Sequence, residues 1–130
     1  MEKLRAKLET AQRALKTFEE ILKEPYSKIV RDASIQRFEY SFEVFWKVVK
    51  IYLEYQEGII CNSPKSCFRE MFSVGLIDEN KTTKLLEMTD DRNLTSHTYD
   101  EDLAEGLYHK LHEHYELMKE VLEIIKRQIK

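Results

Sequence analysis

Residues 35–53 read IQRFEYSFEVFWKVVKIYL and carry the clearest helical pattern in the chain. Apolar side chains recur there at intervals of three and four residues, which places them on one face of an α-helix. They are Ile35, Phe38, Phe42, Phe45, Val49 and Tyr52, with Trp46 and Leu53 widening the same face. The pattern extends back to about Ser27 and stops at Gly58, a residue type that commonly ends helices. We therefore expect a helix of roughly 30 residues, about 45 Å long.

Comparable patterns on either side of this segment predict further helices. Residues 4–22 carry a narrow apolar stripe, and Pro25 ends it because proline disfavours the helical conformation of the preceding residue. Residues 63–75 open with Ser-Pro, which is typical of a helix start, and close with glycine. A fourth helix opens near Asp78, and Asp100 can cap a fifth that runs to the C-terminus. No alternation typical of a strand is present, so we predict an all-α fold, an antiparallel up-and-down bundle of four to five helices.

The composition favours one folded domain spanning residues 1–130. Apolar residues make up 42% of the chain and charged residues 35%, which is typical of globular proteins rather than disordered ones. The net charge of −3 provides no broad attraction to nucleic acid. Any RNA contact would therefore have to come from a local basic site.

The termini and the cysteines suggest a cytoplasmic protein. The N-terminus begins an amphipathic helix without the apolar core of a signal peptide. No segment approaches the ~20 apolar residues that a membrane span needs, so no membrane association is expected. Cys61 and Cys67 lack the CxxC spacing of a metal or redox site, and we expect both to be reduced thiols.

Residues 92–99, RNLTSHTY, combine groups suited to phosphate chemistry. Arg92 offers a permanent planar cation, and His97 can gain or lose a proton near neutral pH. On a regular helix, residues five apart point about 140° away from each other, so Arg92 and His97 would not face one small ligand. They would converge if the helix frays near Thr98, or if two copies of the chain face each other. The spacing therefore favours a composite site.

The same helical geometry selects possible supporting residues. Asn93 shares a stripe with His97, and Asp90 falls on that stripe and could orient the imidazole. Ser96 lies on the neighbouring stripe with Arg92.

Each of these residues also has an ordinary structural interpretation. Arg92 with Asp90 or Asp91 would be a surface ion pair worth about 0–1 kcal/mol. His97 near a helix end would interact with the helix dipole. Tyr99 would pack its ring and leave its hydroxyl in water.

Two other groups of polar residues are more simply explained as surface. His109, His112 and His114 do not form an HExxH pattern, so we expect a solvated helix face and no metal or cofactor. Glu39 and Glu43 lie four residues apart on the long helix. They could line a cleft, although the polar border of a core-facing helix is the simpler interpretation.

Arg92, His97 four intervening residues later, and Tyr99 two residues beyond resemble the signature of HEPN proteins. The similarity is to the branch paired with minimal nucleotidyltransferases, whose members are often called nucleotidyltransferase substrate-binding proteins. Residues 35–47 resemble the long second helix of that family, and residues 63–77 resemble the helix and turn that follow it. The resemblance covers most of the chain.

This resemblance implies a HEPN subunit that works with a small nucleotidyltransferase encoded nearby. It implies toxin-like, metal-independent RNA cleavage, with His97 moving protons and Arg92 stabilising charge on the phosphate. Asn93 could donate a further hydrogen bond, and a homodimer would bring two such sets together. In toxin–antitoxin pairs of this branch the partner attaches AMP to the motif tyrosine, which is Tyr99 here, and so silences the toxin.

Two rival functions remain open at this stage. The chain could be a non-catalytic subunit that presents a substrate to the nucleotidyltransferase, which the acidic composition and the family's common name favour. It could also be a structural oligomerisation bundle with a vestigial motif.

Overall fold

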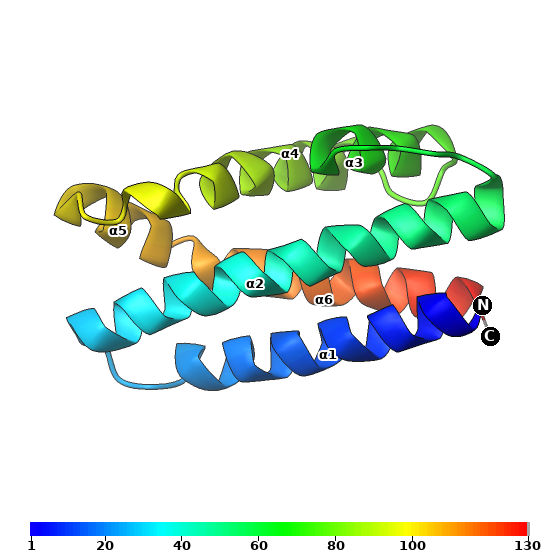
Figure 1. Ribbon diagram of the computed structural model, residues 1–130. Helices are drawn as coiled ribbons and strands as arrows, with labels where there is room; N and C mark the ends of the chain where they lie inside the picture. Colours follow the sequence, from blue (N-terminus) through cyan, green and yellow to red (C-terminus); the bar gives the residue numbers. More distant parts are fainter. Residues whose placement is uncertain (130) are drawn as a thin grey trace.

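The computed structural model describes residues 1–129. In it, helix α2 (Lys28–Tyr52) contacts every other α-helix (Figure 1). The Ser27 hydroxyl caps its start by accepting a hydrogen bond from the Val30 amide at 3.0 Å. The helix continues into a π-helical turn, Leu53–Glu57, and Gly58 ends it in the left-handed conformation at a φ of 67°. The predicted long helix is therefore confirmed.

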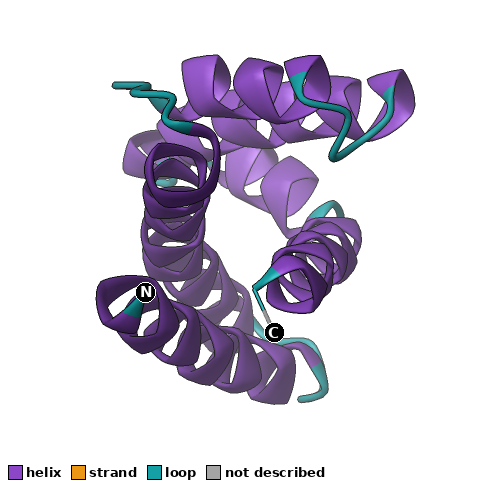
Figure 2. Ribbon diagram, turned by 90° about the vertical axis from the view of Figure 1, so that its right-hand side faces the viewer, coloured by secondary structure: helices purple, strands orange, loops and turns teal. Residues whose placement is uncertain are grey.

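The remaining helices complete an antiparallel bundle with α2 (Figures 1 and 2). They are α1 (Glu2–Leu22), α3 (Pro64–Ser73), α4 (Glu79–Asn93), α5 (Glu101–Tyr108) and α6 (Leu111–Gln128). Helices α1 and α6 pack on one side of α2, and α3 and α4 cover another. No strand occurs in residues 1–129, so the all-α prediction is confirmed, with six α-helices instead of four to five.

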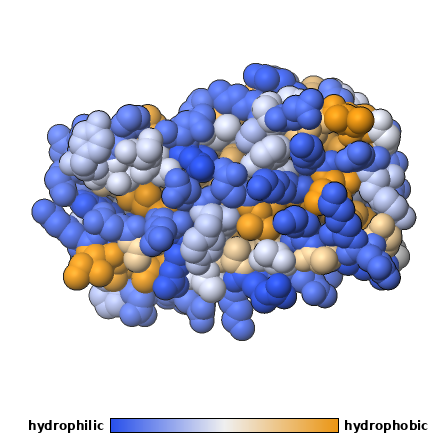
Figure 3. Space-filling view, viewed as in Figure 1, coloured by the Kyte–Doolittle hydropathy of each residue, from blue (hydrophilic) through white to orange (hydrophobic). Residues whose placement is uncertain are grey.

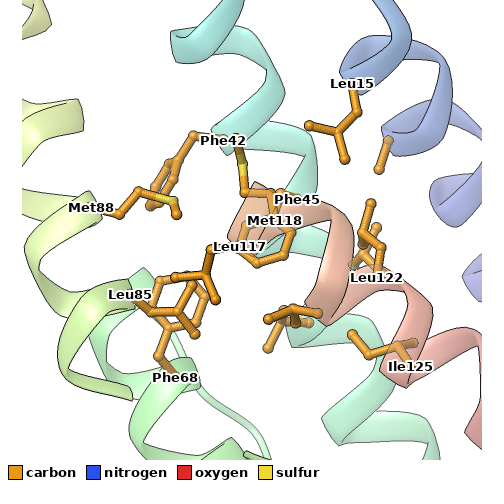
Figure 4. Close-up of a cluster of buried hydrophobic side chains, with 14 of the residues drawn as sticks. Leu15, Phe42, Phe45, Phe68, Leu85, Met88, Leu117, Met118, Leu122 and Ile125 are labelled. Carbon is orange, nitrogen blue, oxygen red and sulfur yellow. The ribbon is translucent and has the colours of Figure 1, made fainter. Parts of the chain in front are cut away.

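Aromatic side chains of α2 join the two sides of the bundle. The ring of Phe68 in α3 lies 6.1 Å from Phe42 and 5.8 Å from Phe45, measured between ring centroids. Leu15, Leu85, Met88, Met118 and Leu122 close around them from the other helices (Figure 4). Each buried aromatic removes a large apolar area from water, so α2 contributes much of the core. On the face seen in Figure 3, hydrophilic side chains dominate and hydrophobic ones form separate patches.

The prediction of one uninterrupted fifth helix was wrong. Helix α5 ends at Tyr108 and α6 begins at Leu111, and the amide of Lys110 bonds to the carbonyl of Leu107, three residues back, at 3.0 Å. The tighter turn lets the chain change direction, because α5 packs on α2 while α6 packs against both α1 and α2. The apolar spacing continues through the bend, which is why the sequence pattern conceals it.

A buried arginine holds α5 against the start of α2. Arg31 is only 2% exposed, and its Nη1 lies 2.7 Å from Glu101 and 3.0 Å from Glu105. The hydrogen bonds that Arg31 donates to the carboxylates of Glu101, Glu105 and Asp32 raise its pKa above the ordinary value, so the buried group stays charged and paired. The Asp100 carboxylate caps α5 by accepting from the Leu103 amide at 3.2 Å, as predicted.

The two cysteines form a disulfide, which corrects the expectation of reduced thiols. Cys61 and Cys67 are both buried, and their Cα atoms lie 5.3 Å apart. The turn into α3 brings them together, because Cys61 precedes the cap at Ser63 and Cys67 occupies the first turns of the helix. Within residues 1–129, no helix combines the length and apolar character needed to cross a bilayer.

Candidate functional site

The motif spans the junction between α4 and α5. Helix α4 ends at Asn93, and the amide of Leu94 bonds back three residues to the carbonyl of Asp91 at 3.0 Å. A 3₁₀ turn, Thr95–His97, then leads to the start of α5. A regular helix therefore does not extend through Tyr99, and the stripes assumed for Ser96 and the residues around it do not form. The helix ends at Asn93, before Thr98, near which fraying would let Arg92 and His97 converge.

Arg92 points onto α2 and meets two carboxylates. Its Nε and Nη2 atoms each lie 3.0 Å from Glu43 Oε1, and Nη1 lies 3.6 Å from Glu39 Oε2. Thr95 Oγ1 also lies 3.1 Å from Glu39 Oε2. The Arg92 side chain keeps about a quarter of its surface exposed, at 25%. Glu39 and Glu43 are therefore part of the site, and reading them as the polar border of a helix missed this contact.

His97 and Tyr99 form an exposed pair. The His97 Nδ1 atom lies 3.3 Å from the Tyr99 hydroxyl, and the two rings meet edge to face with centroids 5.9 Å apart. Tyr99 is 82% exposed, so its hydroxyl is accessible to a large reactant. Asn93 and Ser96 are exposed on the same segment. The chain thus presents an imidazole and a phenol together at its surface.

The structure does not give Asp90 the predicted role of orienting the imidazole. The Asp90 carboxylate lies 2.6 Å from Lys65 Nζ on α3. His97 is not on the same helical stripe as Asp90, because α4 ends at Asn93. Arg92 is directed at α2, whereas His97 contacts Tyr99. Within one chain the two predicted catalytic groups have separate partners, and their convergence across two copies stays a prediction.

His114 was expected on a solvated face, and that prediction was wrong. The residue is 8% exposed, its Nε2 donates to Asp91 Oδ2 at 2.7 Å, and its ring stacks on Phe38 at 5.3 Å. Lys110 Nζ lies 2.8 Å from the other Asp91 oxygen. Burial by itself raises the pKa of Asp91, but the hydrogen bonds from His114 and Lys110 outweigh it and lower that pKa below its ordinary value.

His109, just before α6, and His112, in its first turn, are exposed, as predicted for a solvated helix face. Within residues 1–129 no group of three or more potential metal ligands gathers. A sequence signal for His114 did exist, since it follows Leu111 by three residues and precedes Met118 by four, which is the spacing of the buried stripe.

A charged groove lies elsewhere on the surface. Its volume is about 690 Å³, and it runs between α4 and α6 with charged walls of both signs, including Lys81, Lys84, Glu87 and Glu120. Asp91 and His114 are among its lining residues, whereas the motif residues Arg92, His97 and Tyr99 do not line it. This groove is therefore separate from Arg92, His97 and Tyr99.

The sequence of this chain matches a known protein family over most of its length. The sequence model of the family described as "Nucleotidyltransferase substrate binding protein like" matches residues 6–127. A relative from Haemophilus influenzae named "Probable ribonuclease HepT" is 34% identical over 79 residues, which are 58% of this chain and 53% of the relative. The chain thus spans about half the length of that curated relative.

Solved structures share the fold over nearly the whole chain. A crystal structure of a Thermus thermophilus protein superposes with a TM-score of 0.85 at 43% identity, covering 88% of this chain and 98% of that one. A tri-AMPylated Shewanella oneidensis HEPN toxin in complex with an MNT antitoxin gives a TM-score of 0.78 at 20% identity, covering 95% and 96%. At that identity the second likeness shows the fold alone.

Proposed function

This chain belongs to the nucleotidyltransferase substrate-binding protein-like family, and we propose that it is the HEPN subunit of a two-component toxin–antitoxin system. Its partner would be a small nucleotidyltransferase encoded nearby, and it would act in the cytoplasm as a single-domain homodimer. The HEPN toxin of the same fold, solved in complex with an MNT antitoxin, supports this assignment. The resemblance of residues 92–99 to the HEPN signature supports it at the level of the site.

The activity we assign is metal-independent cleavage of RNA. A ribose 2′-hydroxyl would attack the adjacent phosphorus, and the bond from phosphorus to the 5′-oxygen would break. His97 would transfer protons to or from these oxygens, and Arg92 would stabilise the negative charge on the phosphate. The observation that carries this proposal is the exposed His97 imidazole, whose Nδ1 atom lies 3.3 Å from the Tyr99 hydroxyl.

Glu39 and Glu43 would orient the guanidinium of Arg92 for this task. Arginine has five N–H donors, so those not directed at the carboxylates stay available for phosphate oxygens. The same carboxylates reduce the positive potential at Arg92, which makes one site a weak phosphate binder. A second Arg92 from a facing copy would strengthen binding, in keeping with a composite site.

Tyr99 is the residue we assign as the AMP acceptor. Its hydroxyl oxygen would attack the α-phosphorus of ATP held by the partner, an O–P bond would form, and pyrophosphate would leave. The 82% exposure of Tyr99 supports access of the partner's active site. An AMP group there would cover His97, whose imidazole lies 3.3 Å from the acceptor oxygen, and so block cleavage.

The ribonuclease assignment is tested by incubating the purified protein with varied RNAs in the presence of a metal chelator. Wild type should cleave, and His97→Ala should abolish cleavage, because the proton-transfer group is lost. The exposed His112 on α6 provides the control, so His112→Ala should cleave like wild type. If wild type and His97→Ala are equally inert on every RNA, the ribonuclease proposal fails.

The acceptor assignment is tested by co-expression with the neighbouring nucleotidyltransferase and measurement of the intact mass. Wild type should gain one or more AMP groups, and Tyr99→Phe should gain none. The half-exposed Tyr55 is a matched control, and Tyr55→Phe should be modified like wild type. An unmodified wild-type mass, or adducts that persist in Tyr99→Phe, would exclude Tyr99 as the acceptor.

A non-catalytic substrate-binding subunit is the second candidate function. The pairing of Arg92 with Glu43 and Glu39 favours it, because a guanidinium facing two carboxylates is partly neutralised. Such a subunit would bind the nucleotidyltransferase and change its turnover while leaving RNA intact. The chelator assay and a measurement of the partner's turnover separate the two functions.

A further inference from the structure

Asp91, the residue immediately before Arg92, is buried, and both of its carboxylate oxygens accept hydrogen bonds from residues outside α4. Asp91 is 6% exposed, and its two oxygens are occupied separately, Oδ2 by His114 Nε2 at 2.7 Å and Oδ1 by Lys110 Nζ at 2.8 Å. Both donors come from the bend between α5 and α6 or from the first turn of α6. The end of α4 is therefore attached to the start of α6.

The same contact continues into α2. The His114 ring stacks on Phe38 with a centroid separation of 5.3 Å and an interplanar angle of 22°. Phe38 is followed in α2 by Glu39, the residue whose carboxylate faces Arg92. Asp91 is thus linked to Phe38 through His114. Arg92, the next residue of α4, contacts Glu39, the next residue of α2, directly.

This arrangement holds Arg92 from two directions. Asp91 connects the last turn of α4 to α6, and Arg92 connects that turn to Glu43 on α2. Removing one partner of a buried charged pair leaves the other charge uncompensated, so the turn would have to move to reach water. Any such movement changes the direction of the Arg92 side chain and of the 3₁₀ turn that carries His97.

We propose that Asp91 and His114 are positioning residues for Arg92, which set the orientation of its guanidinium without touching substrate. This inference rests on the proposed function for its catalytic consequence, although the orientation itself is measurable without any activity. A pair that serves stability alone would leave Arg92 with its native partners as long as the protein stays folded.

The test measures the Arg92 Nε–H group directly by ¹H–¹⁵N NMR, with Arg92→Lys identifying the signal. In the wild-type chain this proton is directed at Glu43 Oε1 and should exchange slowly with water. Asp91→Asn and His114→Phe should speed its exchange about tenfold, the factor that corresponds to loss of about one hydrogen bond. His114→Phe keeps an aromatic ring beside Phe38, so it tests the hydrogen bond rather than the packing.

Three further variants make the result specific. His114→Gln restores an N–H donor and should recover part of the slow exchange. His112→Phe, an equivalent change at an exposed position of the same helix, should leave exchange unchanged. Lys110→Met removes the half-exposed partner of Asp91, so this variant should fold even if the buried ones do not, and it should speed exchange in the same direction. Unchanged Arg92 exchange in every folded variant of this network would overturn the proposal.

Activity provides a separate result. If wild type cleaves RNA, Asp91→Asn and His114→Phe should lower kcat about tenfold with little change in KM, and His114→Gln should recover part of it. Wild-type kcat retained in both variants would contradict the positioning role. If wild type does not cleave RNA, the proposed function fails, while the exchange of Arg92 Nε–H still decides whether the pair positions this side chain.

Discussion

Tyr115 shows how a single buried phenol links stability to pH. Its ring meets Phe18 edge to face at 6.0 Å, and the residue is 5% exposed. Burial, with a further contribution from the carboxylate of Glu19, raises the pKa of Tyr115 to about 12. Both effects disfavour the phenolate, so the folded protein keeps this hydroxyl protonated well into the alkaline range.

Stability should therefore decline at alkaline pH because of this residue. A folded-state pKa above the unfolded value of about 10 contributes stability that is complete below pH ~10 and is lost as the pH rises towards ~12. Over that range wild type should lose about 2 kcal/mol more than Tyr115→Phe, measured by urea unfolding at each pH. Equal pH slopes for the two proteins would contradict this. Tyr99→Phe, at an exposed tyrosine, is the control and should keep the wild-type slope.

The bend between α5 and α6 shows how tertiary contacts divide a continuous helical pattern. Helix α5 has only 8 residues, which is too short to be stable by itself in water. Its cap at Asp100 and the ion pairs of Arg31 with Glu101 and Glu105 hold it in place. The bend between α5 and α6 then directs α6 along α1 and α2. It also brings His114 within hydrogen-bond distance of Asp91.

The turn into α3 is closed by the Cys61–Cys67 disulfide, whose presence and contribution to stability can be measured. The Cys61–Cys67 disulfide should leave no free thiol in the unreduced protein, as measured by thiol titration in denaturant. Reduction, or the double change Cys61→Ser with Cys67→Ser, should lower the free energy of unfolding by about 2 kcal/mol, because the unfolded chain regains the freedom of that loop. The double variant also serves as the control, since a reducing agent should not change its stability. Two titratable thiols in freshly purified, unreduced protein would show that the pair is open.

The assembly of whole molecules decides whether Arg92 and His97 act together. Within one chain they have different partners, Glu43 for the guanidinium and Tyr99 for the imidazole. A two-fold dimer could place the Arg92 of one copy opposite the His97 of the other. Light scattering at micromolar concentration should then report a dimer.

Mixing inactive variants tests this composite arrangement directly. Arg92→Ala and His97→Ala should each be inactive, whereas a mixture refolded together should regain about a quarter of wild-type activity. Half of the dimers would be mixed, and each mixed dimer would hold one intact site formed by the native Arg92 of one copy and the native His97 of the other. A mixture as inactive as its components would place both groups of each site in the same chain.

The helices and their caps could be predicted because they depend on neighbouring residues. Apolar spacing identified α1 to α4, and the capping roles of Ser63, Asp78 and Asp100 follow from side chains that accept bonds from amides three residues on. The motif at residues 92–99 was equally visible. The geometry of the motif could not be predicted. Helix α4 ends at Asn93 and is followed by α5, which a contact distant in sequence, between Arg31 and Glu101, attaches to α2.

The sequence by itself determined the helical content, the apolar faces and the family, since periodicity and motif spacing are local properties. Only the tertiary structure decided which charges meet. Arg92 and Glu43 are 49 residues apart, and Asp91 and His114 are 23 apart. The disulfide and the bend at residues 109–110 likewise depend on packing. Such contacts arise from the way separate helices pack, because burial leaves each charged group only the partners that neighbouring helices bring to it.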